Sequence, residues 1–279
     1  MTIDHERRYN PRTTVLDRAS IAARWDIESN RVRHETPCRL DIAYGADPME
    51  RLDLYLPTGQ ARALLIFIHG GYWRANDKRD FAFLAPAFTR AGVMVAMPNY
   101  SLCPSVTVDA IVGQMIQACA WLYRNGRHFG APAGDLVVSG HSAGGHLTAM
   151  MLAALWPQVS SDLPSSLVRA GISFSGVYDV RPLIKVESIN SEVRLDEAMA
   201  TKVSPALIPP ATAAPLHTFV GAEENEGFHI QNDIIAKAWP GVTKTHPDVP
   251  GANHFTILSH LADPISTLNR SVLDIVVSH

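Results

Sequence analysis

Ser142 is the residue of this chain whose surroundings point most directly to chemistry. It lies in GHSAG, residues 140–144, after the apolar run DLVVS at 135–139 and before the helix-forming stretch HLTAMMLAAL. In the pattern G-x-S-x-G, a sharp turn exposes the serine hydroxyl at a helix N-terminus, where partial positive charge favours a developing oxyanion. The pentapeptide alone also fits an ordinary glycine-rich turn, but its position between a strand and a helix favours a nucleophilic serine.

Other glycine-rich and metal-dependent chemistries fit the sequence less well. GHSAGG is not the G-x-G-x-x-G pattern of a dinucleotide-binding loop, and no early strand–helix–strand unit carries that pattern. The chain also has no H-E-x-x-H pattern and no compact group of His, Asp and Glu residues. We therefore expect the reaction at Ser142 to need neither a cofactor nor a metal.

The stretch HGGYW, residues 69–73, supplies candidate donors for an oxyanion hole. An oxyanion needs two or more N–H groups directed at one point, and consecutive glycines let the backbone come close to it. We expect these donors to be the N–H groups of Gly70, Gly71 and Ala143. Two alternatives stay open: Tyr72 in place of Gly70, and an ordinary Gly-Gly turn with aromatic anchors.

Among the 12 histidines, His254 best fits the general base that a serine nucleophile requires. It lies in VPGANHF (249–255), after the strand-like segment VTKTH (242–246). His141 and His146 flank the serine in sequence, but we expect the turn to direct them elsewhere. Structural roles are expected for three further histidines: His69, which would orient its loop by hydrogen bonding, His217 and His229.

The acid that orients the base is expected in VGAEENE, residues 220–226. Its position three residues past Gly221 favours Glu224, with Glu223 as the alternative; a glutamate here also fits a charge at the start of a helix. The chain order Ser142, Glu224, His254 is the nucleophile–acid–base order of α/β-hydrolases.

Continuous apolar runs indicate the strands that must position these residues. Strands that are apolar on both faces are typical of parallel sheets covered on both sides. Helix-period segments alternate with the runs, which predicts a doubly wound α/β sheet with its ligand site at the carboxyl ends of the strands. HGGYW, GHSAG and GAEEN each follow a run directly. The runs are LLIFI (64–68), GVMVAM (92–97), DLVVS (135–139), VRAGISF (168–174) and LHTFV (216–220).

Two alternating segments, RLDIAY (39–44) and RLDLYLP (51–57), predict an antiparallel pair at the sheet edge. Residues 1–35 are rich in arginine and predict an N-terminal arm with helical pieces. With no repeat or long linker, we expect residues 1–279 to form a single domain. Two helix faces are expected to be apolar, the first formed by Ile111, Met115, Cys119 and Leu122, the second by Ile230, Ile234 and Ala238.

The overall composition and charge of the chain limit the kinds of partner that it is expected to bind. A formal net charge of −3 gives no basic surface for nucleic acid and no polybasic patch for a membrane, and the apolar runs are too short to span a bilayer. The N-terminus has no apolar segment typical of a secretory signal. Three cysteines, without C-x-x-C spacing, predict reduced thiols in a cytoplasmic protein: Cys38, Cys103 and Cys119. The expected partner is a small-molecule substrate, and a homodimer stays open.

Taken together, these segments resemble the α/β-hydrolase superfamily and, within it, the arylformamidase (kynurenine formamidase-like) group. The resemblance covers nearly the whole chain. It rests on HGGYW and GHSAGGHL, and on SGVYDVRPL (175–183), SP (204–205), GAEENEGFHIQ (221–231) and YNPR (9–12). It implies hydrolysis of an N-formyl aryl amide such as N-formylkynurenine, with nucleophile, acid and base at Ser142, Glu224 and His254. It also implies that the N-terminal arm and the segment after Asp179 cover the pocket.

The sequence gives less information about the substrate than about the catalytic residues. Tyr72 and Trp73, beside the acyl site, are expected to bind an aromatic substrate. Arg74 follows them and either meets a substrate carboxylate or is simply exposed, the second being the simpler interpretation. A general carboxylesterase for short-chain or aryl esters fits every catalytic residue. A non-catalytic ligand-binding protein on the same scaffold is disfavoured because nucleophile and base are both present.

Overall fold

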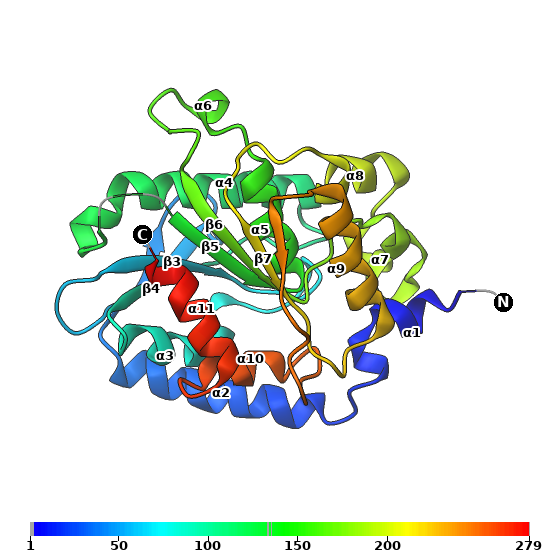
Figure 1. Ribbon diagram of the computed structural model, residues 1–279, viewed down its shortest axis with the longest axis horizontal. Helices are drawn as coiled ribbons and strands as arrows, with labels where there is room; N and C mark the ends of the chain where they lie inside the picture. The colour runs from blue at the N-terminus through cyan, green and yellow to red at the C-terminus, as the bar shows by residue number, and fades with distance from the viewer. Residues whose placement is uncertain (1–2, 133, 135, 279) are drawn as a thin grey trace.

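The computed structural model describes residues 3–132, 134 and 136–278, and an eight-stranded sheet runs through its centre (Figure 1). Asp135, which begins the predicted run DLVVS, lies outside the described residues. The strands are β1 (Cys38–Ala43), β2 (Arg51–Tyr55), β3 (Ala63–Ile68), β4 (Val93–Pro98), β5 (Leu136–His141), β6 (Val168–Phe174), β7 (Leu216–Phe219) and β8 (Thr243–Thr245).

The strand order is β1-β2-β4-β3-β5-β6-β7-β8. β1 pairs with β2, and β2 with β4, in antiparallel register; every later neighbouring pair of the sheet is parallel. All six residues are buried in each of β3, β4 and β5, as their continuous apolar sequences predict. The predicted α/β sheet with antiparallel N-terminal strands is therefore confirmed.

Helices cover both faces of the sheet, and each face has its own apolar core. One core contains residues of α4, α5 and α9, and the other contains residues of α2, α3, α10 and α11. The α-helices are α1 (His5–Tyr9), α2 (Arg18–Glu35), α3 (Ala85–Thr89), α4 (Val108–Asn125), α5 (Ala143–Ala153), α6 (Trp156–Val159), α7 (Glu187–Val193), α8 (Glu197–Lys202), α9 (Glu226–Ala238), α10 (Ile257–Ala262) and α11 (Thr267–Val277). Short 3-10 helices are η1 (Pro11–Thr13), η2 (Lys78–Leu84), η3 (Gly126–Phe129), η4 (Arg181–Lys185) and η5 (Pro205–Leu207).

The two predicted helix faces have different outcomes. The face expected in α4 is buried at all four of its positions. The face expected in α9 is wrong, because the buried positions there are Gly227, Phe228, Gln231 and Ile235. The side-chain oxygen of Gln231 accepts hydrogen bonds from the backbone N–H groups of Tyr178 (2.7 Å) and Asp179 (2.8 Å). A buried polar residue with satisfied partners displaces the apolar stripe that the sequence alone indicates.

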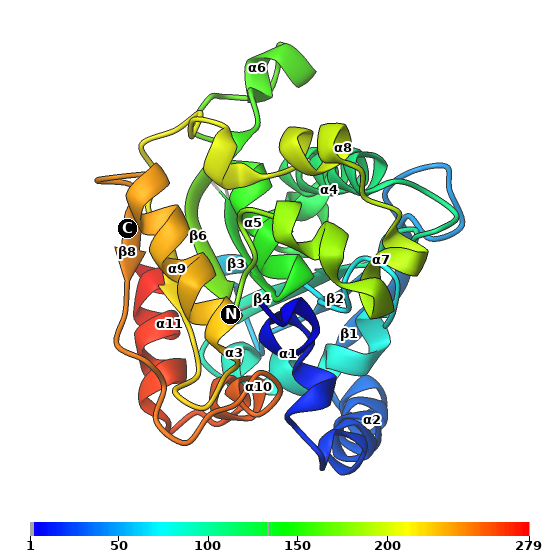
Figure 2. The same ribbon diagram turned by 90° about the vertical axis from the view of Figure 1, so that its right-hand side faces the viewer.

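The N-terminal segment crosses the edge of the sheet at which the parallel strands end. Figure 2 looks onto this edge and shows α1 in front of it, between α7 and α9, with α2 below. Several polar contacts hold the segment there: Asn10 Nδ2 donates to Ser188 Oγ (2.9 Å), Thr14 Oγ1 to Asn225 Oδ1 (2.7 Å), and Arg8 pairs with Glu226 (2.8 Å). The arm therefore covers the edge of the sheet at which the parallel strands of its own chain end.

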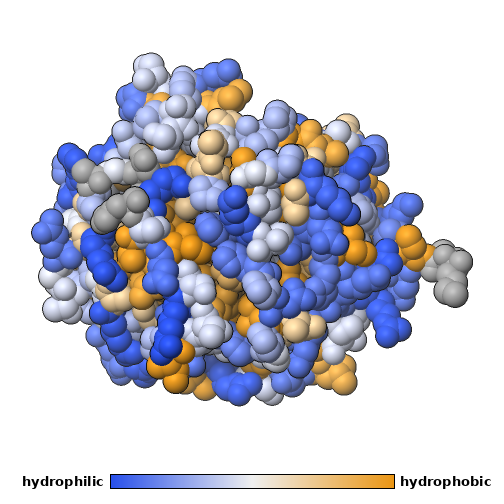
Figure 3. All heavy atoms as spheres, in the orientation of Figure 1, coloured by the Kyte–Doolittle hydropathy of each residue, from blue (hydrophilic) through white to orange (hydrophobic). Residues whose placement is uncertain are grey.

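The face shown in Figure 3 is largely covered by hydrophilic residues, with hydrophobic ones in small separate patches. Within the described ranges, no helix combines the length and hydrophobicity that crossing a bilayer requires.

Candidate active site

Ser142 lies at the sharp turn between β5 and α5. Its backbone adopts φ 57° and ψ −116°, a conformation that costs an L-residue about 1–3 kcal/mol and persists only where the surroundings enforce it. One contact that holds this conformation is a 2.8 Å hydrogen bond from the Ser142 N–H to the carbonyl of Phe174 on β6. The result is a serine presented at the N-terminus of an 11-residue helix.

Glycines on both sides of Ser142 allow α5 to pack directly against the sheet. A Cβ atom on Gly144 would lie 2.0 Å from the carbonyl oxygen of Ile68, and one on Gly140 would lie 2.2 Å from that of Gly144. Both contacts are with backbone that cannot move aside. The small residues of GHSAG therefore serve the close approach of helix to strand that this turn requires.

His254 follows β8 in the loop that leads into α10. Its Nδ1 lies 2.7 Å from Glu224 Oε2, and its ring is stacked on Phe228, with centroids 4.1 Å apart. Both side chains of this pair are almost completely buried. Because Nδ1 is engaged by the carboxylate, Nε2 is the nitrogen left to accept a proton from Ser142, which lines the same cavity as His254.

Glu224 is fixed at both carboxylate oxygens. While Oε2 faces His254, Oε1 accepts hydrogen bonds from the Gly221 N–H (2.7 Å) and the Ser175 hydroxyl (2.5 Å). Glu223 is exposed, and its recorded contact is a backbone bond to the carbonyl of Ala252. The structure thus brings Glu224, and not Glu223, to the imidazole.

Ser175 is a site residue that the sequence analysis missed. It is the first residue after β6, with φ 53°, and its N–H donates to the carbonyl of Phe219 at the end of β7. Its hydroxyl then reaches Glu224. The available signal was its place at the end of a parallel strand, where polar residues meet at one edge of the sheet.

His141 also lies elsewhere than expected. The turn does not direct it away: its ring centroid is 4.6 Å from that of His254, and its Nε2 lies 2.7 Å from the His254 carbonyl oxygen. Burial, and secondly the neighbouring His254, keep the pKa of His141 well below its ordinary value. The neutral ring therefore donates from Nε2 and holds the backbone of His254 without adding a second positive charge beside it. His146 does point away, towards Trp73 and the carbonyl of Val203.

The turn expected to form the oxyanion hole is strained. Gly71, Tyr72 and Trp73 have φ of 121°, 49° and 56°, three successive residues in the left-handed region. Across the part of the chain that the structure describes, the N–H groups of Gly70, Gly71, Tyr72 and Ala143 have no recorded hydrogen-bond acceptor. Of the three turn residues among them, Gly71 and Tyr72 line the cavity that contains Ser142, and Gly70 does not. A Cβ on Gly70 would lie 3.0 Å from that of Ser142, so the turn packs directly beside the nucleophile.

Two side chains contact the carbonyl oxygen of the peptide bond between Gly70 and Gly71. The carbonyl oxygen of Gly70 lies 3.1 Å from the donating Asn76 Nδ2 and 2.9 Å from His69 Nδ1. Within a trans peptide, the C=O of Gly70 and the N–H of Gly71 point in opposite directions. Fixing that carbonyl therefore fixes the Gly71 N–H on the other side of the peptide plane, as an oxyanion donor requires.

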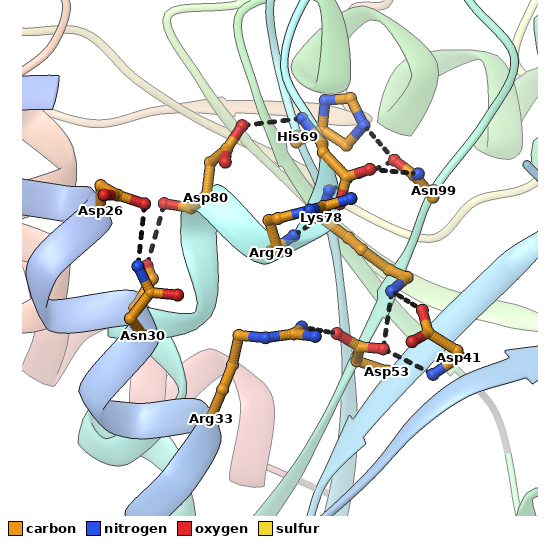
Figure 4. Close-up of polar contacts among 12 residues, drawn as sticks. Asp26, Asn30, Arg33, Asp41, Asp53, His69, Lys78, Arg79, Asp80 and Asn99 are labelled. Atoms are coloured by element: carbon orange, nitrogen blue, oxygen red, sulfur yellow. Dashed lines mark hydrogen bonds and ion pairs between the residues drawn. The ribbon is translucent and has the colours of Figure 1, made fainter.

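His69 connects this turn to a buried ionic cluster (Figure 4). Its Nε2 lies 3.0 Å from Asn99 Oδ1, which also accepts from the Lys78 N–H. The Lys78 ammonium pairs with Asp53 (2.8 Å) and Asp41, and Asp53 also pairs with Arg33 of α2. Burial lowers the pKa of His69, so its neutral ring has one N–H for two acceptors. The Asn76 amide is thus the donor that Gly70 keeps in either tautomer.

Replacing Asn76 by glycine should lower kcat about tenfold, with little change in KM, because one fixed donor on the Gly70 carbonyl is lost. Glycine tolerates the φ of 75° at this position, so the change removes the side chain without straining the backbone. Steady-state kinetics with an unchanged melting temperature check this. A kcat equal to that of the wild type would show that Asn76 does not position the donor.

These groups border a cavity of about 410 Å³. The N-terminal arm, the turn after β3 and α7 all contribute to it. Tyr72 lines the cavity and donates its hydroxyl to the carbonyl of Tyr9, whereas Trp73 is fully buried, packs against His146 and does not line it. Trp73 is therefore a core anchor of the turn, and its expected role in substrate binding is corrected. The lining residues are Asn10, Pro11, Arg12, Arg18, Ala22, Trp25, Asp26, Gly71, Tyr72, Arg74, Asn76, Asp80, Phe81, His141, Ser142, Ile189, His254 and Phe255.

Arg74 also differs from the simpler expectation of an exposed residue. Its side chain is only 14% exposed, lines the cavity and forms an ion pair with Glu192 of α7. Among the described residues, no group of three or more His, Cys, Asp or Glu side chains is arranged to hold a metal ion.

Comparison with known proteins gives a consistent set of relatives. The model of the BD-FAE family matches residues 52–213, more than half of the chain. A kynurenine formamidase of Danio rerio is 28% identical over 280 residues, covering 96% of this chain and 92% of the fish protein. One of Salmo salar is 29% identical and covers 84% of this chain and 81% of its own. A crystal structure from Silicibacter sp. TM1040, whose assignment as a thioesterase is provisional, superposes with a TM-score of 0.86 at 29% identity and covers 99% of this chain and 100% of its own.

Proposed function

Because the chain belongs to the BD-FAE family and is a hydrolase of the esterase and kynurenine formamidase type, we propose that it hydrolyses the N-formyl amide of an aromatic amine, with N-formylkynurenine as the reference substrate. The observation that best supports this proposal is that Glu224 and His254 form a hydrogen-bonded pair and that His254 and Ser142 line the same cavity. The kynurenine formamidase relatives, which match most of this chain, support the choice of substrate.

The proposed reaction has two steps. Ser142 attacks the formyl carbon while His254 accepts the hydroxyl proton at Nε2, and the N–H groups of Gly71 and Ala143 stabilise the oxyanion. His254 then protonates the departing arylamine, which leaves a formyl ester on Ser142. Water attacks this ester while His254 accepts its proton, and His254 then returns that proton to the oxygen of Ser142 as formate leaves. Glu224 keeps the proton of the neutral imidazole on Nδ1 and stabilises the imidazolium form.

The wall of the cavity supports an aromatic leaving group. The indole of Trp25 lies 5.8 Å from the ring of Phe81 and 6.3 Å from that of Phe255, measured between centroids, and all three residues line the cavity. An aromatic amine packed against such rings gains offset or edge contacts in addition to its burial.

A carboxylesterase for short-chain or aryl esters is the second candidate. It is favoured by the catalytic groups themselves, since the nucleophile, the base and the oxyanion donors are as complementary to an ester carbonyl as to a formamide. The structural match to a protein provisionally assigned as a thioesterase also supports hydrolysis of an ester substrate.

Kinetics on purified protein distinguish the two candidates. For a formamidase, kcat/KM for N-formylkynurenine should exceed that for p-nitrophenyl acetate, although the amide is intrinsically less reactive. The Ser142→Ala variant serves as the background in both assays. If the formyl amide is not cleaved above that background while the ester is, the formamidase proposal is wrong and the esterase is retained.

A further inference from the structure

Two guanidinium groups on the catalytic cavity have no acidic partner. Arg12 of η1 and Arg18, the first residue of α2, both line the cavity that contains Ser142. In the described part of the chain, neither side chain takes part in a recorded hydrogen bond or ion pair. Arg74 of the same cavity, by contrast, is already paired with Glu192.

The positive charges reinforce one another. Arg12 is exposed at the mouth of the cavity, but the part of its side chain that is buried lowers its pKa, and repulsion from Arg74 and Arg18 adds to this effect. The carboxylate that acts in the opposite direction, that of Glu192, is engaged by Arg74. Asp17 is the N-cap residue of α2, but its side chain makes no capping hydrogen bond, and the first turn that follows contains no acidic residue.

The two acidic residues of the cavity have hydrogen-bond partners of their own. Asp26 accepts a hydrogen bond from Asn30 Nδ2 one turn along α2, and Asp80 accepts one from the Asp77 N–H. Neither acts on Arg12, whose charged neighbours are Arg74, Arg18 and Glu192. Burial also raises the pKa of Asp80.

The arm that carries these arginines is fixed before any ligand arrives. The Tyr72 hydroxyl donates to the carbonyl of Tyr9, Asn10 contacts Ser188, and Thr14 contacts Asn225. Arg12 therefore lies between two anchored residues. Because the backbone that carries Arg12 is already placed, only its side chain has to be ordered on binding, which favours recognition of a ligand.

We propose that Arg12 and Arg18 form a subsite for a carboxylate on the leaving group of the substrate. The substrate class is then an N-acylated aromatic amine that also bears an acidic group remote from the scissile bond. Guanidinium groups suit this task because their planar N–H donors match a carboxylate. The inference rests on the proposed function, since it concerns the leaving group of the same reaction.

The test compares two substrates that differ in one charge: N-formylkynurenine, and the same molecule with its carboxylate converted to a carboxamide. In Arg12→Gln and Arg18→Gln, KM for the carboxylate substrate should rise about tenfold, because a charge-assisted hydrogen bond is lost. The kcat and the kinetics of the carboxamide should stay within about twofold. Arg24→Gln is the matched control: it removes an exposed arginine from the same helix that does not line this cavity.

Each outcome decides the inference. An unchanged KM for the carboxylate substrate in the Arg12→Gln/Arg18→Gln double variant would overturn it, as would equal losses on both substrates. If the wild type cleaves neither formyl amide, the proposed formamidase function fails separately, and the subsite is tested with 4-acetoxybenzoate against 4-acetoxybenzamide. A carboxylate preference of the wild-type esterase that the double variant loses supports the subsite, and equal kinetics or no hydrolysis of either ester overturns it.

Discussion

Replacing Ser142 by alanine should lower kcat by about 10⁵- to 10⁶-fold, because a triad acts as a unit and loses nearly all of its effect with its nucleophile. The backbone around the turn is held by glycine packing and by the bond to Phe174, neither of which involves the serine hydroxyl. We therefore expect the melting temperature to change little. Turnover of both reference substrates measures the loss, and Ser259→Ala, an exposed serine on α10, is the control.

A fluorophosphonate probe tests the same residue without a substrate. The wild type should form a stable adduct and the Ser142→Ala variant should not. Retention of more than about a tenth of the activity in the variant would refute the assignment, since oxyanion donors and binding alone leave far less. A wild type that takes no label would instead favour the non-catalytic, ligand-binding alternative.

Replacing Glu224 by glutamine should lower kcat by about 10⁴-fold. The Gln carbonyl can still accept from Gly221 and Ser175, so its amide group faces His254 Nδ1 and donates to it. This places the imidazole proton on Nε2. In that tautomer the ring cannot take the proton of Ser142, although the fold is preserved.

Glu223→Gln is a close control for this experiment. It makes the same change in charge one residue earlier, at an exposed side chain, and its backbone contact to Ala252 is untouched. Its kinetics should match those of the wild type. Loss of turnover in Glu223→Gln with normal turnover in Glu224→Gln would reverse the assignment of the acid.

The strands of this fold were predictable because they are buried on both faces. The apolar runs at 64–68 and 92–97 correspond to β3 and β4 almost residue for residue. The same rule fails for α9, where Gln231 occupies the buried face and its partners lie more than 50 residues away. Hydropathy shows where water is excluded, but it does not show where a polar group finds a distant partner.

Within the candidate site, residues fixed by local motifs were easier to predict than those fixed by distant contacts. Ser142 is identified by its pentapeptide and His254 by its position after the last strand. The contact of Ser175 with Glu224 and that of Asn76 with Gly70 follow from no local pattern. The predicted positions of the His141 and Trp73 side chains were wrong, because the orientation of a side chain at a turn depends on neighbours that are distant in the sequence.

The sequence by itself determined the kind of sheet, the candidate nucleophile and the order in which the candidate site residues occur, because these depend on periodicity and on motifs a few residues long. Only the tertiary structure decided that Glu224 faces His254 and that the N-terminal arm covers its own cavity. It also decided that Arg12 and Arg18 have no recorded carboxylate partner among the residues that the structure describes. Those facts depend on contacts between segments separated by tens to hundreds of residues. Such contacts are set by how the whole chain packs, which local sequence patterns do not encode.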